Sequence, residues 1–142
     1  MMWLTKNPEN YNVIVAGNMF GDIVSDAFAG LIGGLGFATS AQFNPENNIA
    51  VFEPTHGSAP KYAGYEESIV NPIAMILSGV MMLEHLGEME MAGRIRKAIA
   101  DVVAEGKVRA YDMLKLKGTP DVIKQGAAST KQMADAIIAK LK

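Results

Sequence analysis

The sequence predicts an α/β chain in which a few strands are flanked by helices. Two short runs, 12–16 and 49–52, are rich in β-branched and aromatic residues and indicate buried strands. Longer stretches between and after these runs carry apolar residues at helical spacing and end at Gly or Pro. A chain of 142 residues that is 49% hydrophobic can bury a sizeable core, so we expect a single folded unit over 1–142.

Composition narrows the class of protein. Charged residues make up 20% of the chain, the net charge is −2 and Lys and Arg form no cluster, which argues against a nucleic-acid partner. The absence of cysteine excludes disulfides, a thiolate nucleophile and Cys-ligated zinc. The N-terminus has no secretory pattern, and the longest apolar helical stretch is too short for a bilayer. We therefore expect a cytoplasmic chain without a membrane partner.

The first third of the chain predicts a helix end, a strand and a helix in that order. Residues 1–6 are typical of the end of a helix that stops before Pro8, and a domain rarely begins there, so we expect part of a longer protein. The strand at 12–16 precedes a helix over 21–30. The glycines of 33–36 follow that helix, whereas those of a dinucleotide fingerprint precede one, so we interpret them as a helix end and turn.

The second strand and the later helices follow from local signals. Residues 44–48 form a turn cluster before the strand at 49–52. One helix opens at Pro72 and stops at Gly87, and a second runs over 88–105. The second helix turns four apolar residues inward: Ile95, Ile99, Val102 and Val103.

Three further assignments complete the pass along the chain. Residues 111–115 indicate a short exposed segment, and a capping box from Ser129 to Gln132 starts the last helix. His85, late in its helix, is interpreted as a favourable charge near the helix end rather than a ligand. The methionines at 75, 81, 82, 89 and 91 are interpreted as core filler.

Asp22 and Asp26 are four residues apart in the predicted helix 21–30. This spacing places both carboxylates on one helix face, where like charges repel unless a cation compensates. Mg²⁺ or Mn²⁺ takes such oxygen ligands. Alternatively, Asp22 stabilises the helix N-terminus and Asp26 is a solvated surface residue. The spacing alone leaves both interpretations open.

The loop 53–62 directly follows the second predicted strand. It packs Glu, Thr, His, Ser, Lys and Tyr between Pro54 and Pro60, and in open α/β sheets ligands bind beyond the carboxyl ends of strands. The prolines fix φ, while Gly57 lets the backbone approach a ligand closely. The alternative is a rigid turn whose polar residues are incidental.

Three motifs in this order, 18–26, 53–64 and 70–72, resemble the β-decarboxylating dehydrogenases, which comprise the isocitrate, 3-isopropylmalate, homoisocitrate and tartrate enzymes. The resemblance covers almost the whole chain. It implies the C-terminal portion of the isocitrate/isopropylmalate dehydrogenase fold. It also implies that Asp22 and Asp26 are ligands of Mg²⁺ or Mn²⁺.

The resemblance further implies a site for the adenine end of a nicotinamide cofactor. NAD-dependent members carry an acidic residue where Lys61 stands, so Lys61 indicates NADP, whose phosphate attracts cations and hydroxyls. Lys115 stands where the family's NADP pattern places a further phosphate contact. Arginine is commoner at this position in the family and binds a phosphate through two hydrogen bonds, which lysine cannot do. The implied cofactor-binding residues are His56, Gly57, Ser58, Ala59, Pro60, Lys61, Tyr62, Asn71, Tyr111 and Lys115.

The implied activity is the metal-assisted oxidative decarboxylation of isocitrate to 2-oxoglutarate with NADP, a tricarboxylic acid cycle reaction on a small 2-hydroxy acid. The alternatives are a fragment of an NAD-dependent 3-isopropylmalate or homoisocitrate dehydrogenase, or a non-catalytic binding or assembly module.

The family pattern places the substrate-binding serine and arginines, the acid–base tyrosine and lysine and a third metal aspartate before this chain. We therefore expect no catalytic residue here and no activity of the fragment alone. The resemblance implies a homodimer, with a dimer-interface and metal-helix region over 1–36 and a cofactor-loop and helical region over 37–142. An isolated fragment would expose these contact faces, so we expect self-association or marginal stability.

Overall fold

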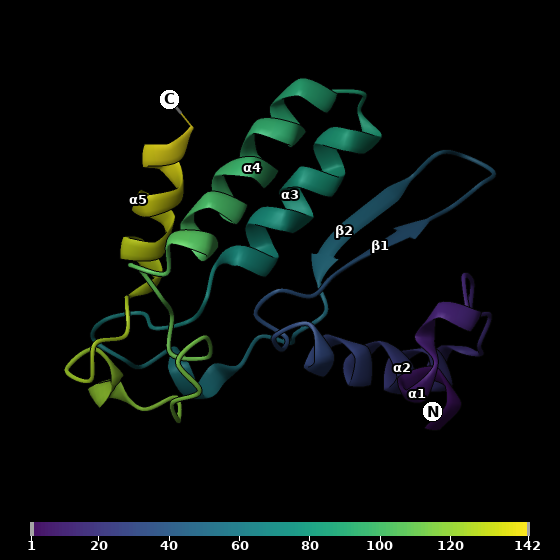
Figure 1. The fold of residues 1–142 in the computed structure, drawn as a ribbon. Helices are drawn as coiled ribbons and strands as arrows, with labels where there is room; N and C mark the ends of the chain where they lie inside the picture. Colours follow the sequence, from purple (N-terminus) through teal and green to yellow (C-terminus); the bar gives the residue numbers. More distant parts are fainter. Residues whose placement is uncertain (1, 142) are drawn as a thin grey trace.

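The computed structural model describes residues 2–141 and contains a two-stranded sheet and helices (Figure 1). The fold class expected from the sequence is therefore confirmed. The elements in chain order are α1 (Met2–Lys6), α2 (Asn18–Leu31), β1 (Thr39–Phe43), β2 (Ala50–Pro54), α3 (Ile73–His85), α4 (Met89–Glu105) and α5 (Thr130–Lys140), with 3₁₀ turns at Pro8–Asn10, Pro60–Tyr62 and Pro120–Val122.

The sheet is an antiparallel hairpin in which Ala41 lies opposite Phe52. The predicted turn cluster joins its strands: the Asn44 side chain accepts a hydrogen bond from the Glu46 N–H at 2.9 Å, and Asn48 has a φ of 57°. β2 confirms the second predicted strand. β1 was not predicted, because its sequence Thr-Ser-Ala-Gln-Phe lacks the apolar β-branched pattern of a buried strand.

The core lies where α3, α4 and α5 pack together, with the sheet against the other side of α3 (Figure 1). The main cluster of buried side chains comprises Ile73, Ala98, Ile99, Val102, Ala110, Met133 and Ile137. The segments that precede α3 and α5 form a smaller cluster of Ile69, Val122 and Ala127.

The helix ends agree with their sequence signals. α3 is followed by Gly87 with a φ of 84°, and α4 by Gly106 with a φ of 62°. At α5, Ser129 Oγ accepts the Gln132 N–H at 3.3 Å, and Gln132 Oε1 accepts the Ser129 N–H at 2.9 Å. The predicted capping box is confirmed.

The predicted strand at 12–16 is wrong. This run is irregular and exposed, with Val13 82% and Val15 94% accessible. A strand is stable only when a neighbouring strand pairs with its N–H and C=O groups. Within residues 2–141 the only paired strands are those of the hairpin, so the run has no partner.

Three burial assignments also require correction. Met75, Met82, Met89 and Met91 are exposed rather than core filler, because α3 and α4 pack through other faces. Val103 is 37% exposed. The segment 111–115 is mostly half-buried, since its residues 111 and 114 pack on the smaller cluster.

α2 projects away from the α3–α5 layer (Figure 1). Only Ala29 of this helix is buried, while Met19, Phe20 and Ile23 are largely exposed. None of the helices described in residues 2–141 has the length and apolarity to cross a membrane.

Candidate functional site

A cavity of about 510 Å³ lies where four segments distant in the sequence meet. The loop after β2 forms one wall, the residues before α3 form another, and the segments 34–36 and 111–112 complete the lining. The lining residues are Gly34, Leu35, Gly36, His56, Gly57, Ala59, Lys61, Tyr62, Val70, Asn71, Tyr111 and Asp112.

The loop after β2 has a defined backbone shape. His56 Nδ1 lies 2.9 Å from the Gly57 carbonyl oxygen. Ala59 has a φ of 43°, a left-handed conformation that costs a non-glycine residue about 1 kcal/mol. The 3₁₀ turn Pro60–Tyr62 follows at once and fixes the direction in which Lys61 leaves the backbone.

One edge of the cavity combines a cation with two phenols. Tyr111 Oη donates a hydrogen bond to Tyr62 Oη at 3.3 Å, and Lys61 Nζ lies 4.7 Å from the centre of the Tyr62 ring. The bond from Tyr111 lowers the pKa of Tyr62, while burial raises the pKa of Tyr111. A positive charge beside hydroxyl groups is an arrangement that suits an anionic ligand such as phosphate.

Asn71 and Asp112 form another part of the cavity lining. Asn71 is 3% exposed; its Nδ2 donates to Asp112 Oδ2 at 3.0 Å, and its Oδ1 accepts the N–H of Ile73 at 3.0 Å. Asp112 Oδ1 accepts the N–H of Met113, also at 3.0 Å. Gly36 lies so close that a Cβ there would overlap the Asp112 carboxylate. These contacts join α3, the glycine turn and the segment 111–113.

Asp22 and Asp26 lie one turn apart on α2, and both are exposed. In residues 2–141 no group of three or more His, Cys, Asp or Glu side chains is placed to hold a metal ion. The chain therefore offers two carboxylates on one helix face. These fit part of the shell of a hard divalent cation, whose remaining oxygen ligands must come from water, substrate or other protein segments.

Comparison with known proteins assigns the chain to a family. Residues 1–137 match the isocitrate/isopropylmalate dehydrogenase family. The chain belongs to this family. The family suggested by the sequence motifs is thereby confirmed.

Individual members resemble the chain closely over only part of their own length. It is 51% identical to the NADP isocitrate dehydrogenase of Thermus thermophilus over 78% of this chain and 22% of that protein. It is 47% identical to the isocitrate/homoisocitrate dehydrogenase of the same species over 99% of this chain and 37% of that protein. The isocitrate dehydrogenase structure from Methylococcus capsulatus superposes with a TM-score of 0.82 at 40% identity, covering 99% of this chain and 38% of that one. The chain thus spans well under half the length of these members of the isocitrate/isopropylmalate dehydrogenase family.

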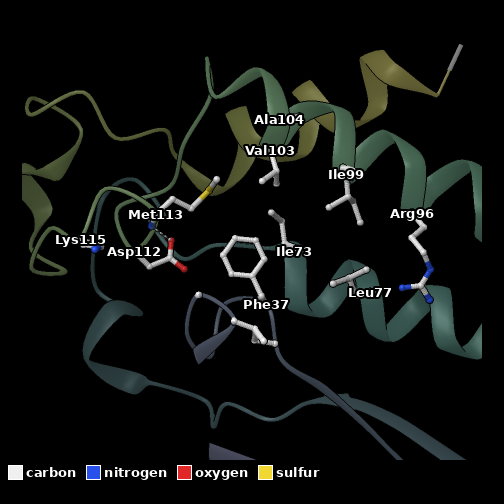
Figure 2. Close-up of a pocket in the computed structure, with 13 residues that line it drawn as sticks. Phe37, Ile73, Leu77, Arg96, Ile99, Val103, Ala104, Asp112, Met113 and Lys115 are labelled. Atoms are coloured by element: carbon white, nitrogen blue, oxygen red, sulfur yellow. Dashed lines mark hydrogen bonds between the residues drawn. The ribbon is translucent and has the colours of Figure 1, made fainter. Parts of the chain in front are cut away.

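Seven of the ten residues predicted to bind the cofactor line the cavity of about 510 Å³ described above: His56, Gly57, Ala59, Lys61, Tyr62, Asn71 and Tyr111. Ser58 and Pro60 belong to the same loop but do not line it. Lys115 lines a second cavity of about 660 Å³ between α3 and α4. Figure 2 shows Phe37 pointing into this second cavity, with Asp112 and Lys115 at one end and Arg96 at the other. Asp112 lines both cavities.

Sequence reasoning did not identify Asp112 or the turn 34–36 as part of a site. The turn had an available signal, because several glycines close together permit close backbone approach. Asp112 had none, since its importance depends on Asn71, 41 residues earlier in the chain.

Proposed function

We propose that this chain is the C-terminal part of an NADP-dependent isocitrate dehydrogenase, to which it contributes the adenosine end of the cofactor site and two metal ligands. The observation that carries the proposal is the cavity in which the loop 56–62, Asn71 and Tyr111 meet. Membership of the family and similarity to a relative named as an NADP isocitrate dehydrogenase support it.

The residues of the cavity account for the choice of NADP. The 2′-phosphate carries a charge near −2, which Lys61 attracts and to which the hydroxyls of Tyr62 and Tyr111 can donate hydrogen bonds. Gly57 presents no side chain, so the adenosine can approach the loop backbone. Lys115 adds a second positive charge next to Asp112, which lies between the two cavities.

On α2, Asp22 and Asp26 would hold Mg²⁺ or Mn²⁺ through their carboxylate oxygens. When bound, the cation supplies Lewis-acid polarisation of the substrate's oxygens, and the nicotinamide accepts a hydride. The substrate is a small 2-hydroxy tricarboxylate or dicarboxylate. The exposed apolar side chains of α2 support a homodimer with this helix at the subunit interface. A cytoplasmic location is part of the proposal.

The cofactor assignment is tested by measuring NADP and NAD binding to the chain by calorimetry. Replacing Lys61 by Asp places a carboxylate against the 2′-phosphate, so NADP affinity is expected to fall about tenfold or more while NAD affinity does not. Lys117→Asp makes the same charge change at an exposed lysine outside the cavity and is the matched control. An unchanged preference in Lys61→Asp would contradict the assignment.

The relative named as an isocitrate/homoisocitrate dehydrogenase favours homoisocitrate as a second candidate substrate. The complete protein containing this chain, assayed with Mn²⁺ and each substrate, separates isocitrate, homoisocitrate and 3-isopropylmalate dehydrogenases. The 142-residue chain alone is expected to reduce no NADP with isocitrate. Turnover by the chain would contradict the proposal that its catalytic groups lie elsewhere, and NADP binding without turnover in the complete protein would favour a non-catalytic module.

A further inference from the structure

The cavity of about 510 Å³, here called the nucleotide cavity, contains a polar contact between Asn71 and Asp112, here called the Asn71–Asp112 pair. The amide of Asn71 is held at both ends, its nitrogen by the carboxylate of Asp112 and its oxygen by the N–H of Ile73. The carboxylate is itself held by the N–H of Met113. Each partner therefore fixes the orientation of the next.

This arrangement permits only one orientation of the Asn71 amide. Rotating the amide by half a turn would place Oδ1 against the Asp112 carboxylate and Nδ2 against the N–H of Ile73. Two hydrogen bonds would become two repulsive contacts around Asn71, which is 3% exposed, and unsatisfied polar groups are costly where water is excluded. The Asp112 carboxylate thus decides which end of Asn71 faces it.

The fixed orientation leaves Asn71 with a defined hydrogen-bonding character. Nδ2 carries two hydrogens, of which the bond to Asp112 uses one, while the bond from Ile73 engages Oδ1. Because Asn71 lines the cavity, the second N–H is available to a ligand there. Through this N–H, Asn71 can act toward a ligand as a donor.

We propose that Asp112 is a positioning residue for the nucleotide: through Asn71 it keeps an N–H donor directed to a hydrogen-bond acceptor of the ligand, such as a ring nitrogen of adenine. This inference rests on the proposed function of the cavity as a nucleotide site. It adds a residue that no cofactor-binding motif of the sequence indicated.

The test compares Asp112→Asn with the double variant Asn71→Asp/Asp112→Asn. Met113 and Asn71 donate to different oxygens of the Asp112 carboxylate, and the carboxamide in Asp112→Asn keeps only one of these oxygens, so one bond is lost. The double variant restores all three bonds. The carboxylate introduced at position 71 accepts from Ile73 and from the amide introduced at position 112, whose oxygen accepts from Met113. A carboxylate, which only accepts, then stands where the Asn71 donor was.

Thermal unfolding and NADP titration of the full chain are measured for each variant. Asp112→Asn is expected to lower the unfolding midpoint by about 5 °C and to weaken NADP binding about tenfold. The double variant is expected to regain the midpoint of the unaltered chain while its NADP affinity stays weakened about tenfold or more. Asp135→Asn, at an exposed aspartate outside the nucleotide cavity, is the control for loss of a carboxylate.

Two outcomes would overturn the inference. Full recovery of NADP affinity in the double variant would mean that Asp112 only stabilises the fold, and unchanged affinity in Asp112→Asn would mean that the amide orientation does not matter to the ligand. If only the complete protein containing this chain binds NADP, the same variants are titrated there. If neither the unaltered chain nor the complete protein binds NADP, the proposed function fails first. Recovery of the midpoint in the double variant would then still support the fixed amide orientation and overturn only its role toward the nucleotide.

Discussion

Gly36 shows how a single missing side chain shapes the cavity. Its carbonyl oxygen accepts the N–H of Ala74 at 2.9 Å, and a Cβ added to it would collide with Asn71 and Asp112. Close approach of this turn to the Asn71–Asp112 pair is possible only because glycine has no Cβ. A side chain at position 36 would therefore disturb the cavity as well as the turn.

Replacing Gly36 by Ala is expected to reduce the free energy of unfolding by about 2 kcal/mol, because the added methyl group must displace the Asp112 carboxylate or the turn. NADP affinity should fall with it. Chemical denaturation and calorimetry measure the two effects. Gly30→Ala, where a Cβ meets nothing within 4 Å, is the matched control and should be neutral or stabilising. Equal behaviour of the two variants would contradict the steric argument.

At this scale the sequence predicted residue types better than partners. Lys61 and Tyr62 became candidates because they lie in a polar loop directly after a predicted strand and match a motif of the family. The pairing of Asn71 with Asp112 could not be predicted, since nothing local to either residue names the other. Long-range side-chain partners follow from the packing of elements and are not encoded in spacing.

Among the elements, the contact between α4 and α5 includes an ion pair of Glu105 and Lys140 near their ends. Lys140 lowers the pKa of the Glu105 carboxyl. A carboxyl whose pKa is lower in the folded state stabilises the fold above its unfolded pKa, and this stabilisation is lost as the pH falls through the folded value.

Glu105→Gln is therefore expected to lower the unfolding midpoint slightly at pH 7 and to have no effect at acidic pH, where Glu105 of the unaltered chain is protonated. The effect should be small, because both side chains are partly exposed, and it should shrink further in high salt. Thermal unfolding across pH and salt measures it. Glu67→Gln, at an exposed glutamate outside α4 and α5, serves as the control. A destabilisation that persists at acidic pH would contradict the electrostatic origin.

The helices could be predicted because their signals are local. A 3.6-residue period, a capping box and a glycine stop each act within a few residues. α3 and α4 are followed by a glycine stop, and α5 begins with a capping box. Strands depend on neighbours. β1 forms without a strong pattern because β2 lies beside it, whereas 12–16 has the pattern and no partner strand within residues 2–141.

The molecule as a whole exposes much apolar surface at its N-terminal end. Val13, Val15, Met19, Phe20 and Ile23 are all more than half accessible. Apolar surface of this kind, gathered on one helix and the run before it, marks a contact site. The relatives are much longer than this chain, so further protein segments exist in them to provide such contacts.

The isolated chain is therefore expected to self-associate with increasing concentration, as measured by sedimentation velocity. The double variant Phe20→Ser/Ile23→Ser should shift the distribution toward monomer. Met75→Ser/Met82→Ser makes a similar change on the exposed face of α3 and is expected to have a smaller effect. A monomer at every concentration, or an equal response to both double variants, would contradict assignment of the contact to α2.

α3 connects two features described above, the nucleotide cavity and the hairpin. Its first residue, Ile73, is tied to Asn71 in the cavity, and its last, His85, lies 5.5 Å from the ring centres of both Phe43 and Phe52 in the hairpin. A helix of 13 residues behaves as a stiff rod at this length. A displacement of Asn71 on ligand binding would therefore move α3, and the hairpin that contacts its other end would move with it.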